Sequence, residues 1–94
     1  MPTAARDIIV KNKLGLHARP AMQFVDTANQ FTSDIKVFKG GEEPVEADGK
    51  SVMQMIILAA TEGTPLRIEA EGADAADAVQ KLADLFESKF GEED

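Results

Sequence analysis

The sequence predicts an α+β fold in which three helices cover one face of a four-stranded antiparallel sheet, in the order β-α-β-β-α-β-α. Two observations predict this class. Segments with the period-two alternation of strands take turns with segments whose apolar residues recur at helical spacing. In addition, Gly40 and Gly41 leave only a short connection between two neighbouring strands, which indicates a hairpin, whereas helices join the other strands. One layer of helices is therefore expected on one layer of strands.

The first half of the chain supplies three of the expected strands and one helix. A short β-branched run predicts the first strand at residues 7–11. Apolar residues at helical offsets predict a helix over 18–31, and Pro20 is tolerated in its first turn because the missing amide would have no intrahelical partner there. Alternating polar and apolar residues predict a second strand at 34–39, with a short return strand at 44–47.

The second half of the chain supplies two helices around one strand. Ser51 and Gln54 form an S-x-x-Q capping box, which predicts a helix over 52–60. Alternation predicts a fourth strand at 66–71, and Asp74 is expected to cap the third helix. The apolar face of that last helix comprises Ala78, Val79, Leu82, Leu85 and Phe86.

Composition limits the classes of function. The chain of 94 residues at 10.1 kDa fits one domain, 1–94, with 44% hydrophobic and 29% charged residues. A net charge of −7 argues against non-specific nucleic-acid binding and against binding to anionic membranes. The absence of cysteine and the single histidine exclude disulfides, thiolate zinc sites and two-histidine metal sites.

Targeting signals are not expected either. No apolar run approaches the roughly 20 residues of a membrane span, and the N-terminal residues lack the apolar stretch of a signal peptide. We therefore expect a cytoplasmic protein, monomeric by default, with no metal or cofactor.

The only histidine, His17, lies at the expected N-terminus of the first helix. Imidazole is an unusual N-cap. A phosphoryl group on the ring could instead accept hydrogen bonds from the amides of Ala18 and Arg19 at the positive end of the helix. The Arg19 guanidinium adds a cation suited to phosphoryl oxygens. The pattern indicates a phosphorylation site, and the alternative is an ordinary surface histidine.

The residues around His17 resemble those of a known family. The segment L-G-L-H-A-R-P-A at 14–21 resembles the phosphorylation-site signature of the HPr family of histidine-containing phosphocarriers. D-G-K-S-V-M-Q-M at 48–55 is similar to the regulatory serine segment of that family, and I-E-A-E-G-A-D-A-A-D-A at 68–78 to its fourth strand and third-helix start. Length and element order extend the resemblance to nearly the whole chain and imply an HPr-like open-faced sandwich.

This resemblance implies a role in the phosphoenolpyruvate-dependent phosphotransferase system. His17 would accept a phosphoryl group on Nδ1 from phosphorylated enzyme I and pass it to an enzyme IIA domain. Arg19 would orient the phosphoryl group, and the backbone amides of Ala18 and Arg19 would bind its oxygens. The protein would be a substrate of both reactions and not itself an enzyme.

Ser51 has two compatible interpretations. As the first residue of a capping box, it is an ordinary N-cap. The resemblance also implies regulatory phosphorylation by an ATP-dependent HPr kinase/phosphorylase. A second function stays open on this basis: a regulatory HPr-like binding protein in which phosphorylated Ser51 contacts a transcription regulator in carbon or nitrogen control.

The second predicted helix is apolar on almost every side, so part of it must be exposed. We assign a core stripe to Val52, Ile56 and Ala59. Met53 has a flexible thioether suited to several partners. A docking patch around His17 is expected to comprise Leu16, Pro20, Ala21 and Met53.

The sequence departs from the family pattern in the hairpin and in the first helix, where Gln23, Asp26 and Asn29 occupy exposed turns that carry lysines in members serving enteric sugar uptake. The segment 40–49 is longer and more acidic than expected, which should alter the hairpin and not the site. The ending F-E-S-K-F-G-E resembles the nitrogen-related NPr branch, whereas H-A-R-P-A resembles the sugar branch. Both branches therefore remain open.

Overall fold

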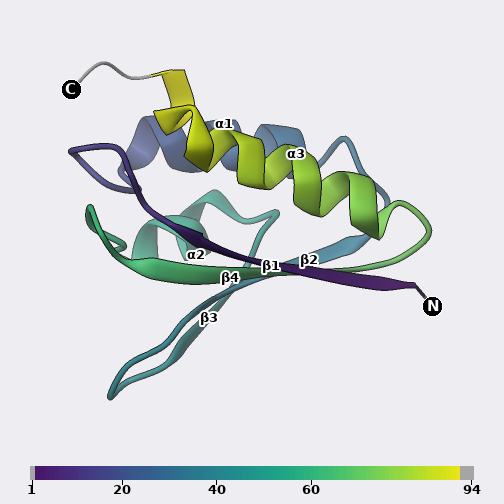
Figure 1. Cartoon of the computed structure of the whole chain (residues 1–94), viewed down its shortest axis with the longest axis horizontal. Helices are drawn as coiled ribbons and strands as arrows, with labels where there is room; N and C mark the ends of the chain where they lie inside the picture. Colours follow the sequence, from purple (N-terminus) through teal and green to yellow (C-terminus); the bar gives the residue numbers. More distant parts are fainter. Residues whose placement is uncertain (1, 92–94) are drawn as a thin grey trace.

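The computed structural model describes residues 2–91, which form one antiparallel four-stranded sheet with helices on one face (Figure 1). In their order across the sheet, the strands are β1 (Thr3–Ile9), β4 (Pro65–Glu71), β2 (Asp34–Lys39) and β3 (Val45–Asp48). The helices are α1 (Ala18–Ala28), α2 (Val52–Ile57) and α3 (Ala75–Glu87), followed by a 3₁₀ helix at Lys89–Gly91. The predicted fold class and element order are confirmed.

The central strand β4 explains why one face of the sheet is buried. It pairs with β1 on one side and with β2 on the other, so that Ile68 lies opposite Arg6 and Val37. Ile68 and Val37 are buried under the helices. On the open face, Arg67 forms ion pairs with Asp7 at 3.2 Å and with Glu69 at 3.0 Å. The period-two pattern of the sequence thus separates a core face from a charged face.

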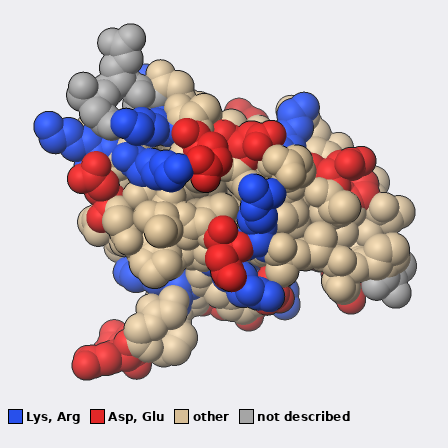
Figure 2. Space-filling view, in the orientation of Figure 1, with Lys and Arg blue, Asp and Glu red and all other residues tan. Residues whose placement is uncertain are grey.

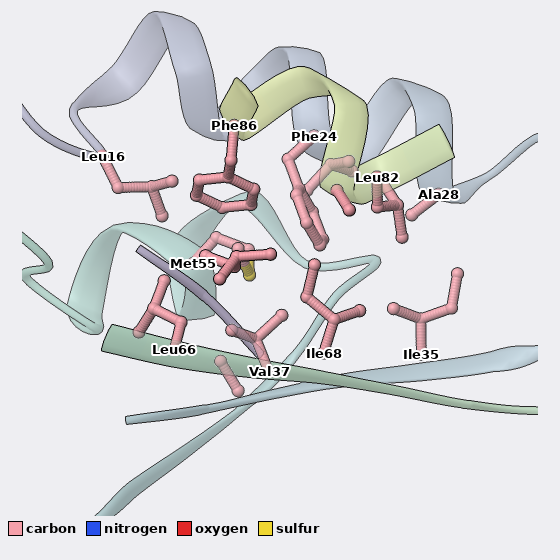
Figure 3. Packing of buried hydrophobic residues seen from close by; sticks show 14 of the residues in the cluster. Leu16, Phe24, Ala28, Ile35, Val37, Met55, Leu66, Ile68, Leu82 and Phe86 are labelled. Carbon is pink, nitrogen blue, oxygen red and sulfur yellow. The ribbon is translucent and has the colours of Figure 1, made fainter. Parts of the chain in front are cut away.

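Aromatic rings join the helices in the core (Figure 3). Phe24 of α1 meets Phe86 of α3 edge to face, with 5.9 Å between ring centroids. Phe86 also contacts Phe90, at 4.8 Å between centroids. Phe90 reaches the core because Lys89 and Phe90 adopt φ values of 56° and 55°, which turn the chain back after α3. This end of α3 lies close to the segment that carries His17, since Leu16 points toward Phe86 in Figure 3.

Several predicted boundaries differ from those in the structure. β1 begins at Thr3 and not at residue 7, because its first residues pair with the far end of β4. Residues 3–6 are mostly polar or small, so they give little strand signal of their own. α1 ends at Ala28, three residues before its predicted end. β3 is shifted by one residue to Val45–Asp48.

The predicted core stripe of α2 is wrong for Ile56 and Ala59, whereas Val52 packs against the core. Met55 and Leu58 face the core, whereas Val52 is half-buried and Ile56 and Ala59 are exposed. The helix ends at Ile57, and Ala59 takes a φ of 52° that turns the chain away from a helical path. Because Gln54 is the only polar residue of this helix, its pattern could not indicate which side packs against α1 and β3.

Asp74 occupies the predicted N-cap of α3, but its carboxylate does not cap that helix. It accepts hydrogen bonds from the Ser33 hydroxyl, from the Thr32 amide at 2.9 Å and from the Ser33 amide at 3.0 Å. The Ser33 hydroxyl, followed by the Thr32 amide, lowers the pKa of Asp74 to about 2. The side chain therefore ties the loop before β2 to the start of α3.

Candidate functional site

The segment between β1 and α1 begins with a tight turn over residues 12–15. The Gly15 amide donates to the Asn12 carbonyl at 3.1 Å, and the Asn12 side-chain amide donates to the Gly15 carbonyl. Gly15 has a φ of +72°, and a Cβ there would lie 2.5 Å from the Ala60 carbonyl oxygen. Only glycine satisfies both the backbone conformation and the close approach.

A second turn, over residues 59–64, fixes this segment from the side. The Leu16 amide donates to the Ala60 carbonyl at 2.8 Å. Further back, Val10 exchanges backbone hydrogen bonds with Gly63 and Thr64, at 2.8 and 3.0 Å. The chain is thus fastened on both sides of the turn immediately before His17.

The end of α3 anchors the same segment. Lys11 forms an ion pair with Glu87 at 2.6 Å, and its hydrogen bond and charge lower the pKa of that carboxyl. Both side chains are about half-exposed, so the pair orients the segment more than it stabilises the fold. The side chain of Leu16 is only 3% exposed.

His17 is the N-cap residue of α1, as predicted. Its backbone is extended, with φ −79° and ψ −170°, and its carbonyl accepts the first intrahelical hydrogen bond from Ala21 at 3.0 Å. The half-buried ring makes no capping hydrogen bond to the helix. Ala18 and Arg19 provide the amides of the first turn, and Pro20 provides none.

Arg19 is exposed next to this helix end, and among residues 2–91 it makes no hydrogen bond or ion pair. A guanidinium without a competing carboxylate is available for an anion. Together with the two amides and the positive end of an 11-residue helix, it makes a site for phosphoryl oxygens attached to the His17 ring.

Charge is distributed unevenly despite the net value of −7. Figure 2 shows Lys and Arg side chains gathered where α3 ends and the loop between β1 and α1 lies. Acidic side chains gather at the tip of the β2–β3 hairpin, far from that loop. The cations Lys11, Lys13 and Arg19 belong to the segment around His17. The local charge therefore suits an anionic group more than the overall charge suggests.

Ser51 is the N-cap of α2, which confirms its predicted structural role. Its hydroxyl oxygen accepts from the Gln54 amide at 3.2 Å. The other half of the predicted capping box is different, because the Gln54 side chain accepts from the Asp48 amide at 2.8 Å. The neighbouring Lys50 side chain donates to the Phe31 carbonyl at 2.8 Å.

The docking residues predicted beside His17 require correction. Leu16, Pro20 and Ala21 are all buried and cannot present a surface to a partner. These buried residues before and after His17 anchor its backbone to the core. Met53 is 73% exposed, as predicted.

Other exposed apolar residues were missed by the sequence analysis. They are Leu14 in the turn, Met22 on α1 and Ile57 on α2. For Met22 a signal was present, since it lies one position outside the helical stripe that contains Ala21 and Val25. For Ile57 no signal existed, because all residues of α2 except Gln54 are apolar.

Two kinds of feature are absent from residues 2–91. Within residues 2–91, no three or more His, Cys, Asp or Glu side chains converge as metal ligands would. None of the helices described in this range has both the length and the apolar character needed to cross a bilayer.

Comparison with known proteins identifies the family. Residues 4–88 match the family model for the PTS HPr component phosphorylation site. The chain is 44% identical over 87 residues to the phosphocarrier protein HPr of Neisseria meningitidis, covering 93% of this chain and 94% of that protein. It is 41% identical over 91 residues to the phosphocarrier protein NPr of Proteus mirabilis, covering 97% of this chain and 99% of its relative.

A solved structure agrees with these matches. The crystal structure of HPr-C-His from Thermoanaerobacter tengcongensis superposes with a TM-score of 0.84 at 44% identity, covering 96% of this chain and 98% of that one. The fold and the family match thus define a small phosphocarrier. The chain belongs to the HPr family of the phosphotransferase system.

Proposed function

We propose that this chain carries a phosphoryl group on Nδ1 of His17 from phosphorylated enzyme I to enzyme IIA domains in the cytoplasm. The observation that supports this most directly is the placement of His17 at the N-cap of α1 without a capping hydrogen bond from its ring. The first-turn amides of Ala18 and Arg19 are thereby left for an anion attached to the ring.

The transfer is an in-line displacement at phosphorus. The Nδ1 lone pair of His17 attacks, the bond between phosphorus and the donor histidine of enzyme I breaks, and its electron pair returns to the donor ring. The second transfer repeats these events with His17 as the leaving group. Arg19 and the Ala18 and Arg19 amides bind the phosphoryl oxygens, and positioning supplies most of the acceleration. The chain is a substrate in both steps.

Partner docking is assigned to the exposed apolar side chains of α1 and α2, two helices that contact each other. These side chains are Met53, which the sequence also indicates, and Met22 and Ile57 in place of the buried Leu16, Pro20 and Ala21. Met53→Asp should weaken binding of enzyme I and leave the free energy of unfolding unchanged. An equal loss of stability would show that Met53 belongs to the core.

Ser51 phosphorylation by an HPr kinase/phosphorylase is proposed as a control on the same surface. Ser51 precedes Met53 by two residues and is half-buried at the start of α2. A phosphate there adds negative charge beside an apolar docking surface and disfavours partners that desolvate it. The second candidate function follows from the same position: the phosphorylated serine would contact a transcription regulator.

The deciding experiment measures intact mass after incubation with phosphoenolpyruvate, Mg²⁺ and enzyme I from the same organism. We expect one acid-labile phosphoryl adduct in the wild type and none in His17→Ala. An absent adduct, together with an acid-stable adduct on Ser51 after incubation with ATP and the kinase, would favour the regulatory function instead.

A further inference from the structure

Asn12 is a polar side chain that is only 1% exposed and has no part in the transfer chemistry described above. We propose that Asn12 is a positioning residue that holds the backbone before His17 in the orientation needed for phosphoryl transfer. This inference rests on the proposed function of His17 as the phosphoryl acceptor.

The geometry concerns a single peptide group. The Gly15 carbonyl and the Leu16 amide belong to the same planar unit, which moves as a rigid body. The Asn12 side-chain amide donates to its oxygen, and the Ala60 carbonyl accepts from its nitrogen at 2.8 Å. One peptide plane is thus clamped at both ends, by two groups that are far apart in sequence.

The clamp acts directly on His17 because little freedom remains after it. The Leu16 side chain is buried, and Ala18 is already helical. Only the peptide unit between Leu16 and His17 therefore separates the clamped plane from the helix. Loss of the Asn12 donor would allow the Gly15–Leu16 plane to rotate and would change the direction in which the His17 ring leaves the backbone.

The rest of the turn suits this role. The Gly15 amide donates back to the Asn12 carbonyl, so Asn12 contacts both sides of the residue at φ +72°. A merely structural asparagine would stabilise the turn without affecting transfer. A positioning asparagine affects the chemical step, where a displacement of about 1 Å can reduce the rate about 100-fold.

The test compares Asn12→Asp with a control of matched stability. Asp has nearly the same shape as Asn but has no amide donor and adds a carboxylate, so Asn12→Ala, which removes the donor without adding charge, is measured beside it and should show the same fall in kcat. Val79→Ala, on the half of α3 away from Phe86, provides a buried control that destabilises the fold elsewhere. Phosphorylation by enzyme I is measured at a temperature at which all of these proteins are folded. We expect kcat to fall at least about tenfold in Asn12→Asp with KM within about twofold, and no such fall in Val79→Ala.

A second readout does not depend on the phosphoryl transfer. Amide hydrogen exchange at Leu16 should be faster in Asn12→Asp and in Asn12→Ala than in Val79→Ala, and Asn12→Ala serves if the Asp variant does not fold. Equal kcat values in Asn12→Asp and Val79→Ala, with a phosphorylated wild type, would overturn the role of Asn12 alone. A wild type that is never phosphorylated on His17 would overturn the proposed function, and the role of Asn12 with it.

Discussion

Met53 and Met55 provide a matched pair for one substitution. Met55→Ala should lower the stability of the fold, whereas Met53→Ala should weaken docking to enzyme I. They lie two residues apart on α2, but Met53 is 73% exposed and Met55 is 0% exposed. Met55→Ala removes a fully buried side chain and should cost about 2–5 kcal/mol of unfolding free energy. Met53→Ala should change that free energy by less than about 0.5 kcal/mol.

The size of the effect makes the comparison decisive. A domain of 94 residues has a total stability of about 5–14 kcal/mol, so Met55→Ala removes a large share of it. In urea, with an m-value of about 1.5 kcal/mol/M, the unfolding midpoint should fall by about 1–3 M.

For the KM of phosphorylation by enzyme I, the substitution at Met53 should have the larger effect and the substitution at Met55 the smaller. Met53→Ala raises KM by about fivefold or more if it contributes about 1 kcal/mol to docking, whereas folded Met55→Ala leaves KM unchanged. Equal urea midpoints for the two variants would refute the assignment of one methionine to the core and the other to the surface.

Three further predictions concern the fold. The Ser33 hydroxyl and neighbouring amides lower the pKa of Asp74 from 3.8 to about 2, so this carboxylate stabilises the fold above pH about 4 and loses that effect as pH falls through about 2. Asp74→Asn should therefore have a lower urea midpoint near neutral pH, and a gap that persisted unchanged in acid would contradict this. Ser51→Ala should cost about 0.5–2 kcal/mol through loss of the N-cap, with Ser51→Asp costing less, and equal melting curves for all three proteins would argue against capping. Gly49→Ala places a Cβ 2.6 Å from a β2 side chain and should cost about 1–3 kcal/mol, whereas Gly40→Ala meets nothing within 4 Å and should be nearly neutral, as thermal unfolding of both variants would show.

The parts of the fold that sequence could predict are those determined within a few residues. Ser51 caps α2 because the donor, the Gln54 amide, lies only three positions away. The apolar stripe of α1 and the alternation of apolar and polar residues in β4 likewise predict which of their side chains are buried. His17 could be placed at the start of α1 for the same reason, since the helix pattern begins immediately after it.

The parts that sequence could not predict depend on contacts between distant segments. Residues 3–6 become a strand only because β4 pairs with them. The buried side of α2 is the side that packs against α1 and β3. The carboxylate of Asp74 accepts hydrogen bonds from Ser33, 41 residues away, and not from its own helix. The clamp on the Gly15–Leu16 peptide is of the same kind, because its second partner is Ala60.

The burial of Leu16, Pro20 and Ala21 means that these three neighbours of His17 anchor it to the core and cannot also provide a docking surface. In the proposed mode of docking, apolar contact with partners is made instead by exposed side chains such as Met53, on a different helix. Substitutions around the anchored peptide should then act mainly on kcat, and substitutions on the exposed face of α2 mainly on KM. Because Asn12 lies buried in the turn before α1 and Met53 lies exposed on α2, a double variant combining Asn12→Asp with Met53→Asp should show nearly additive losses in log kcat/KM.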